Sequence, residues 1–257
     1  MNKFEGLDFY DFEFNGERLS SFGGCVGSSD GGLKTYSILP ARSRVTDRPL
    51  NSDITYEFSS ALEPRTFEVP IVFEQIRDGD LRKIAAWLDS PTPSKFRFIG
   101  DDVYINAELD STDFNAQSTS GQDAQIALKF ICHDPYYYDF NMTKYRFEEE
   151  VVASGLVFEV ENKGYGEIYP NIKISCTGDT TINIRDASGK IYRQSHVSNI
   201  VGGVIIDSTT LECTLFSGAN HFQYIDKFPA IPQGKCTIEI LTDTFSYMTV
   251  EFRNKYI

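Results

Sequence analysis

Apolar and polar residues alternate along most of this chain, and a period of two residues predicts β-strands with one buried face. In the segment RTFEVPIVFEQI, the side chains of Phe67, Val69, Ile71 and Phe73 fall on one face. Pro70 lies within this run, which favours an edge position or a bulge, because proline cannot donate to a strand ladder. Further strands are expected at 96–98, 103–109 and 125–132.

One segment, DGDLRKIAAWLD, has a different period. Four of its apolar residues recur at the spacing of one helix face, and Asp78 or Asp80 can cap the first turn. Pro91 follows soon after and stops the helix. The pattern therefore predicts one substantial helix at about 79–89.

Two extended runs flank turn-forming residues near 47–51 and predict a long two-stranded arm over about 36–58. A hairpin of this length leaves strand edges that need a partner. Arginine forms bidentate pairs with carboxylates, and the rest of the chain is acidic. The candidate subunit contacts are Arg42, Arg44, Arg48 and Tyr56. The alternative is a solvated hairpin.

The pattern of apolar and polar residues changes near residues 141–150. Beyond it, short strands such as LVFEV, YPNIKIS, TINIR, KCTIEIL and MTVEF recur between turn signals such as NKG and TGD. Even spacing without helices indicates a β-sandwich. We therefore predict a mainly β chain of two domains, 1–142 and 143–257.

The charge and the cysteine content of the chain argue against several classes of function. The chain has 257 residues and a formal net charge of −13. Residues 1–143 carry 13 Lys and Arg against 23 Asp and Glu, a balance of −10. Binding of nucleic acid through a basic patch is not expected. Five cysteines without C-x-x-C spacing predict buried reduced thiols, and no signal peptide or membrane insertion is expected.

The sequence Cys132-His133-Asp134 has the residue types of a thiol–imidazole–carboxylate set. Adjacent strand residues point to opposite faces, so Cys132 is expected on the apolar face, away from His133. Asp101-Asp102 favours a hairpin turn over a metal site or an acid–base pair. The other two histidines are isolated, and the Gly-rich stretches lack the lysine of a phosphate loop. No catalytic, metal or cofactor site is predicted.

Carbohydrate-binding modules often share the architecture expected for the second domain. Sugar platforms favour exposed aromatic rings, but the only Trp, Trp87, lies on the predicted helix. Tyrosine also suits half-buried strand positions. The tyrosines of this domain that form the candidate platform are Tyr165, Tyr169, Tyr192, Tyr224 and Tyr247.

Taken in order, these features resemble a known family. The order is an Asn-Gly hairpin, the Arg-bearing arm, RTFEVPIVFE before LRKIAAWL, then KFRFIGDDVYINAELD and ALKFICHDPYYY. It resembles the N-terminal ring domain of phage distal tail proteins, over about residues 1–140. The remainder, with YPNIKISCTGDTTINI and FPAIPQGKCTIEI, resembles their C-terminal galectin-like sandwich, itself similar to a carbohydrate-binding module. The length is that of the short form without inserted carbohydrate-binding modules.

The resemblance implies a structural virion protein, without enzyme activity or cofactor, at the distal end of a phage tail and assembled in the host cytoplasm. Six copies would form a homo-hexameric ring whose N-terminal domains, β-sandwich-like with one helix, line the bore. The ring would join the tail tube protein to the tail-associated tip protein, with the tape measure and receptor-binding proteins as further partners. DNA would pass through the bore without specific binding. The alternative function is a carbohydrate-binding accessory protein that recognises host cell-wall glycans through the C-terminal sandwich.

Overall fold

The computed structural model describes residues 11–27, 39–47, 53, 55–73, 76, 78–110, 116–119, 123–148 and 156–257. The chain divides into two compact units, Met1–Tyr137 with Ile257, and Tyr138–Tyr256. Strands predominate in both, and the described residues contain one α-helix and two short 3₁₀ helices, Leu19–Phe22 and Phe222–Tyr224. The predicted mainly β fold class is confirmed.

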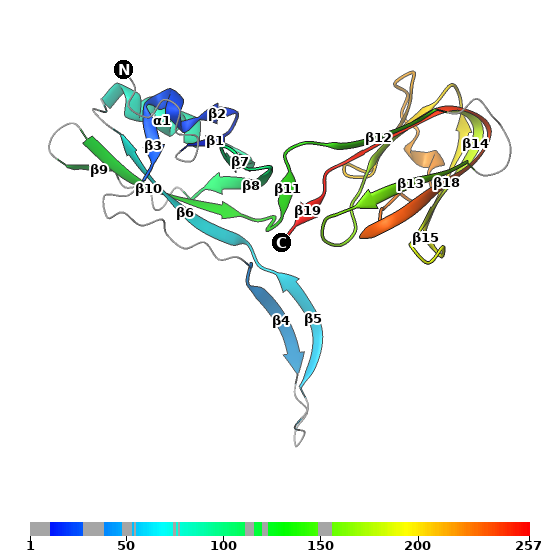
Figure 1. Cartoon of the computed structure of the whole chain (residues 1–257), viewed down its shortest axis with the longest axis horizontal. Coiled ribbons are helices and arrows are strands. Elements are labelled where there is room, and N and C mark those ends of the chain that lie inside the picture. Colours follow the sequence, from blue (N-terminus) through cyan, green and yellow to red (C-terminus); the bar gives the residue numbers. More distant parts are fainter. Residues whose placement is uncertain are drawn as a thin grey trace. The chain divides into compact units, whose positions relative to one another are not determined.

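The first unit is built on an antiparallel sheet in the order β2-β1-β7-β8-β10-β6-β3, with β9 paired to β10 (Figure 1). Asn15 and Gly16 join the first two strands with φ of 49° and 78°, left-handed values that suit these residue types. The strands are β1 (Phe12–Phe14), β2 (Glu17–Arg18), β3 (Gly24–Val26), β6 (Arg65–Phe73), β7 (Ser94–Phe98), β8 (Val103–Leu109), β9 (Ala116–Thr119) and β10 (Asp123–Cys132).

Strands β6 and β10 form the longest pair of this unit. They pair in unbroken register from Arg65 opposite Cys132 to Phe73 opposite Ala124. Alternate residues of both strands enter the core, and Phe130 of β10 is fully buried among other aromatic rings. The apolar residues that recur every second position in the sequence are therefore the ones that are buried in the core.

Helix α1 (Asp78–Leu88) contributes to the core of the first unit, and the predicted helix is confirmed. Ile84, Trp87 and Leu88 are buried, whereas Ala85, expected on the same face, is exposed. The indole Nε1 of Trp87 donates to the carbonyl of Phe14 at 2.7 Å. The buried face therefore includes Trp87, because this hydrogen bond satisfies the one polar group of the ring.

Strands β4 (Arg42–Asp47) and β5 (Tyr56–Leu62) form a separate two-stranded antiparallel sheet. This hairpin corresponds to the predicted arm, and Figure 1 shows its two strands side by side. Only Glu63 and Pro64 separate it from β6. Arg48 and most of the predicted turn lie outside the described residues.

The second unit is one seven-stranded antiparallel sheet in the order β12-β18-β14-β16-β17, with β13 paired to β18 and β15 to β14. Its core includes Ile172 and Ile174 from the first half of β14 and Ile182 and Ile184 from the second half, so the sheet curls over a single core. The strands are β12 (Thr143–Glu148), β13 (Leu156–Asn162), β14 (Asn171–Arg185), β15 (Ile191–Ile200), β16 (Val204–Asp207), β17 (Glu212–Leu215) and β18 (Gly234–Phe252).

The two longest strands of this unit differ from the short strands that the sequence predicted. The TGD sequence at 177–179 was expected to be a turn between two short strands. It lies instead within β14, where the register to β18 shifts between Thr177 and Thr180 and Gly178 has a φ of 95°. Likewise, β18 runs without a break through both the KCTIEIL and MTVEF segments. The short-strand prediction was wrong here, because a β-bulge uses the same residue types as a tight turn.

The two ends of the second unit are held together by what we call the end clamp, Asp139, Arg253 and Asn254. They belong to the segments around β11 (Tyr137–Asp139) and β19 (Lys255–Tyr256). The Asp139 backbone N–H donates to the Asn254 carbonyl at 3.0 Å, and Asn254 Nδ2 donates to Asp139 Oδ2 at 2.7 Å. Arg253 Nη1 donates to the Asp139 carbonyl at 2.8 Å. Three hydrogen bonds thus fix the entry and exit of this unit.

Candidate assembly surface

The arm formed by β4 and β5 has no buried face. Every residue of β4 is exposed, and only Leu62 of β5 is partly buried. An isolated two-stranded hairpin is marginally stable in water, and its free edges pair readily with another chain. The arm therefore has no apolar core of its own among the described residues.

A β-bulge sorts the side chains of the arm into two faces. The register shifts by one residue between Val45 and Thr46, so Phe58 is the extra residue on β5. Val45 lies on the face opposite Arg44, and Phe58, as the extra residue, has no partner of its own on β4. Tyr56, paired with Asp47, lies on the face of Val45. Val45, Tyr56 and Phe58 are 61%, 51% and 69% exposed, and we call them the arm's exposed apolar residues.

The opposite face of the arm is polar. Arg44 and Glu57 lie there with 3.8 Å between guanidinium and carboxylate, and both side chains are exposed, so the pair contributes about 0–1 kcal/mol. Arg42 lies on the same face and has no ion-pair partner within the described part of the chain. Of the candidate subunit contacts, Arg42 and Arg44 thus share one face and Tyr56 lies on the other. The structure does not describe Arg48.

Arg65, directly after the arm, is only 5% exposed. Its guanidinium lies over the ring of Tyr137 at 4.7 Å from the centroid. Its Nε and Nη2 atoms are buried and have no hydrogen-bond partner among the residues that the structure describes. Burying such donors without acceptors is costly, so we expect Arg65 to lower the stability of the isolated chain. Sequence patterns did not single it out, because arginine is usually exposed.

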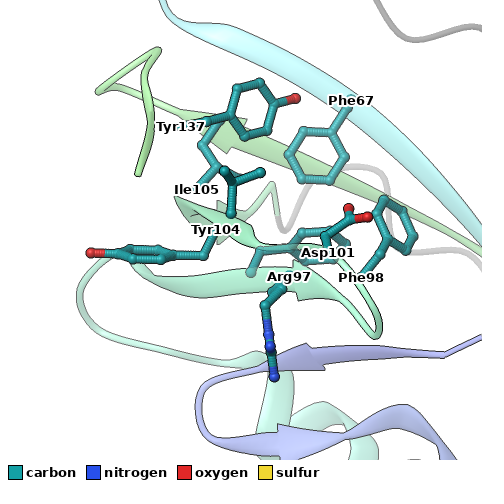
Figure 2. Close-up of a pocket in the computed structure, with 9 residues that line it drawn as sticks. Phe67, Arg97, Phe98, Asp101, Tyr104, Ile105 and Tyr137 are labelled. Carbon is teal, nitrogen blue, oxygen red and sulfur yellow. The ribbon is translucent and has the colours of Figure 1, made fainter. Parts of the chain in front are cut away.

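An aromatic pocket of about 370 Å³ lies in the same unit (Figure 2). Phe98 and Tyr137 are half-buried and Asp101 is exposed, so the pocket opens to solvent. Most of its wall is formed by apolar and aromatic side chains, namely Phe67, Phe96, Phe98, Val103, Ile105 and Tyr137.

Carboxylates lie at the rim of the aromatic pocket. Asp101 closes the turn after β7, where its N–H donates to the Phe98 carbonyl at 3.1 Å, in agreement with the predicted hairpin turn. Partial burial raises the pKa of Asp101, and the neighbouring Asp102 raises it further, against the opposing effect of Arg97. Within the described residues, no group of three or more His, Cys, Asp or Glu could hold a metal ion.

Cys132 and His133 point to opposite faces of the sheet, and the predicted orientation is confirmed. Cys132 is fully buried, whereas His133 is exposed and its Nε2 lies 2.8 Å from Glu108 Oε1. Burial raises the pKa of the Cys132 thiol to about 12, although Arg65 partly opposes this shift. A protonated thiol that points away from the imidazole is not an activated nucleophile.

Two of the tyrosines considered for sugar binding meet on a single carboxylate in the second unit. The hydroxyls of Tyr169 and Tyr192 donate to the two oxygens of Glu167, at 2.7 Å for Tyr192. These hydrogen bonds, that of Tyr169 first, lower the pKa of Glu167. Both rings are 44% exposed. Tyr224 stacks instead on His221.

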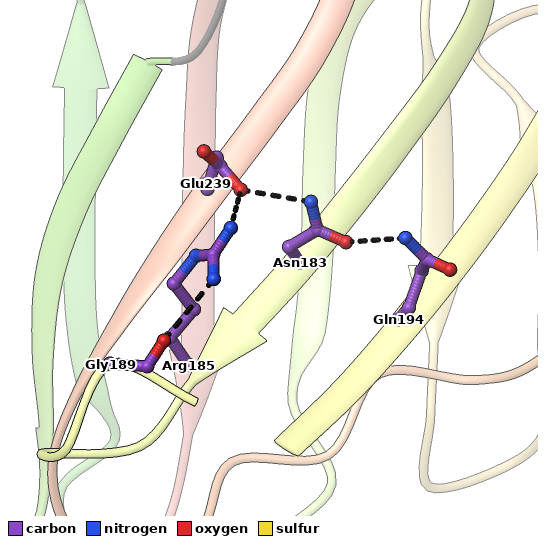
Figure 3. A network of polar contacts seen from close by, with 5 residues as sticks. All are labelled: Asn183, Arg185, Gly189, Gln194 and Glu239. Carbon is purple, nitrogen blue, oxygen red and sulfur yellow. Dashed lines mark hydrogen bonds and ion pairs between the residues drawn. The ribbon is translucent and has the colours of Figure 1, made fainter. Parts of the chain in front are cut away.

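A polar network on the second unit links β14, β15 and β18 (Figure 3). Glu239 Oε2 accepts from Asn183 Nδ2 at 2.9 Å and from Arg185 Nη2 at 2.8 Å. Asn183 in turn accepts from Gln194 Nε2 at 2.9 Å. The bonds from Asn183 and then Arg185 lower the pKa of Glu239. All of these partners are side chains of the unit itself, so the network stabilises the sheet.

Residues 7–134 match a family model described as "Phage tail protein N-terminal domain". This part of the chain belongs to the phage tail protein family. The match includes the arm, α1 and every residue lining the aromatic pocket except Tyr137. No curated protein matches the sequence at a significant level. The described residues contain no helix long and apolar enough to cross a membrane.

Solved structures share the fold of this phage tail protein. The SPP1 Dit (gp 19.1) protein, described as a paradigm of the hub adsorption apparatus in phages that infect Gram-positive bacteria, aligns with a TM-score of 0.70 at 16% identity. The alignment covers 96% of this chain and 99% of that one. Together with the family match, it confirms the resemblance to distal tail proteins.

Two structures of the phage P2 baseplate in its activated conformation also align with this tail protein. The one with calcium has a TM-score of 0.47 and 11% identity, and covers 87% of this chain and 90% of its own. The one with strontium has a TM-score of 0.47 and 10% identity, and the alignment covers 96% of this chain and 99% of that one.

Proposed function

We propose that this chain is the subunit of a distal tail hub, an adaptor ring that joins the tail tube to the tail-tip and host-adsorption apparatus. The observation that carries the proposal is the arm, because a hairpin exposed on both faces requires a second chain. The fold shared with SPP1 Dit supports it. The role is structural, without a catalytic residue or cofactor.

In this proposal six copies form a closed ring. The arm of one copy contacts the body of the next, and a head-to-tail contact repeated around an axis closes. Arg42, Arg44, Arg48 and Tyr56 are the proposed subunit contacts. Residues 1–142 form the ring and 143–257 a galectin-like sandwich. The partners are the tail tube and tail-associated tip proteins, with the tape measure and receptor-binding proteins beyond them.

The charge of the chain suits passage of DNA through such a ring. Residues 1–143 carry 13 positive and 23 negative side chains, a balance of −10. DNA is itself a dense line of negative charge, so an acidic wall repels it. We infer that side chains facing the ring axis are net negative and that DNA passes without specific binding.

The mass of the full chain in solution tests the ring. Light scattering after size exclusion, over a range of protein concentrations, is expected to give six times the mass of one chain. A monomer at every concentration would overturn the proposal. Retention on DNA at physiological salt would overturn the inference about the bore.

A second candidate function is that of an accessory protein that binds host cell-wall glycans. The exposed pair of Tyr169 and Tyr192, oriented by Glu167, favours it, because exposed aromatic rings suit the faces of sugars. Pulldown of the full chain with cell walls tests it. Binding that is lost in Tyr169→Ala but kept in Tyr224→Ala would support this function, and no binding by the unchanged chain would rule it out.

A further inference from the structure

The aromatic pocket of the first unit is apolar along its wall and carries a carboxylate at its rim. Ring surface comes from Phe67, Phe98 and Tyr137, which are half-buried. Asp101 also lines the pocket and is exposed, and Figure 2 shows its carboxylate beside the ring of Phe98. This division suits a ligand whose apolar end enters the pocket and whose polar end stays at the rim.

The size and the wall of the pocket favour an aromatic ring as the apolar end. The volume of about 370 Å³ lies in the range of small ligand pockets. The rings of Phe96 and Phe98 are 5.1 Å apart and 88° to each other, and those of Phe67 and Phe96 are 4.9 Å apart and 64° to each other. The wall therefore presents ring edges beside ring faces, and a further ring can pack edge-to-face or offset against them.

The charge at the rim favours a cation as the polar end. The side chain of Asp101 has no hydrogen bond or ion pair to any residue that the structure describes, and the exposed Asp102 follows it directly. Arg97 also lines the pocket, but its Nη2 pairs with Glu13 at 3.0 Å, and Figure 2 shows its side chain directed away from the rings. The rim is therefore negative, and a carboxylate forms charge-assisted hydrogen bonds with an ammonium group.

We propose that the aromatic pocket binds an arylalkylamine, with the aromatic ring of the ligand against Phe67 and Phe98 and its ammonium group at Asp101. The guanidinium of Arg65 already lies over the ring of Tyr137, which places the ammonium at the carboxylate and not over that ring. Every lining residue belongs to the first unit of one chain, so the site does not depend on the ring of six.

Titration of the full chain with three ligands that share a phenyl ring tests the site. The probes are phenethylamine, the neutral phenethyl alcohol and the anionic hydrocinnamate, followed by isothermal titration calorimetry at neutral pH. Phenethylamine is expected to bind in the millimolar range of so small a ligand, at least about tenfold more tightly than the alcohol, with hydrocinnamate weakest. Equal binding of all three, or no binding of phenethylamine, would overturn the proposal.

A charge reversal at the rim gives the sharper result. In Asp101→Lys, hydrocinnamate is expected to bind more tightly than phenethylamine, a change of order that a purely structural role of Asp101 would not produce. The position is exposed, so the substitution leaves the core intact. Asp102→Asn is the matched control, because its side chain does not line the pocket. This control is expected to keep the order of the ligands and to change the dissociation constant of phenethylamine by less than about threefold.

The methyl signals of Val103 and Ile105, which line the pocket, locate the bound ring in the unchanged chain by nuclear magnetic resonance. Phenethylamine is expected to shift both signals and to leave that of Ile182, in the core of the second unit, unchanged. Shifts confined to other residues would overturn the proposal. Phenylalanine amide carries the same ring and ammonium on a peptide-like body. Tighter binding of this amide would identify the first residue of a peptide as the natural source, and weaker binding would identify a free amine.

Discussion

Replacing Arg65 with leucine is expected to stabilise the isolated chain. Arg65 is 5% exposed, and two of its guanidinium nitrogens have no hydrogen-bond partner among the described residues. Each buried donor left unsatisfied costs about 1–3 kcal/mol, and the cation–π contact with Tyr137 returns about 2 kcal/mol. Leucine fills the site without these donors, so we expect the free energy of unfolding to rise by up to about 4 kcal/mol.

Chemical denaturation followed by tryptophan fluorescence measures this change. Trp87 is the only tryptophan and is buried in the first unit, so its emission reports the unfolding of that unit. Arg97→Leu is the matched control. Arg97 Nη2 pairs with Glu13 at 3.0 Å, and its loss leaves that carboxylate alone. The free energy of unfolding is expected to fall by about 1 kcal/mol in this control.

The two arginine variants should therefore move in opposite directions. A loss of stability in Arg65→Leu as large as that in Arg97→Leu would refute the reasoning, since it would mean that Arg65 has acceptors in the folded chain. A stabilised Arg65→Leu monomer that no longer assembles would be informative in another way. It would indicate that a neighbouring copy supplies the acceptors.

Three further predictions follow from the same structure. Deletion of residues 42–52 should leave both units folded by circular dichroism but give monomers by light scattering; a hexamer would mean that the arm does not hold the ring. Cys132→Ala should lower the free energy of unfolding by about 1–2 kcal/mol through a small core cavity, and His133→Ala by less than about 0.5 kcal/mol, both from denaturation curves. Equal effects would contradict the burial of the thiol. Glu239→Gln should be less stable than the unchanged chain at neutral pH. The folded pKa of Glu239 lies below the ordinary value of a glutamate, so its contribution is present above the unfolded pKa and is lost as pH falls through the folded pKa. The two chains should therefore converge in acid, and a constant difference in melting temperature down to low pH would contradict this.

The local pattern of apolar and polar residues was sufficient to predict part of the fold. Strands β6 and β10 and helix α1 were predictable, because each buries one face and the burial period is visible in the residues themselves. The orientation of Cys132 followed from the same period. The helix face was predicted less well, because the burial of Trp87 depends on aromatic rings and a backbone carbonyl that are distant in the sequence.

Other features depend on contacts that no local pattern contains. Gly178 has a left-handed φ whether it forms a turn or a bulge, and only the pairing of β14 with β18 decides between them. The bulge at Phe58 also depends on register, so the sequence placed Tyr56 with the arginines although the arm holds them on opposite faces. Arg65 was missed because its burial comes from Tyr137, far along the chain.

The end clamp has a consequence for how this protein can be altered. Asp139 and Asn254 hold the entry and exit of the second unit within hydrogen-bonding distance. The chain therefore leaves this unit at nearly the same point at which it enters. Domain insertion succeeds where the two ends of the inserted piece lie together. The second unit therefore has the layout of an interchangeable cassette. A different β-domain with adjacent ends can be grafted between residues 139 and 254 while the first unit keeps its own sheet, arm and pocket.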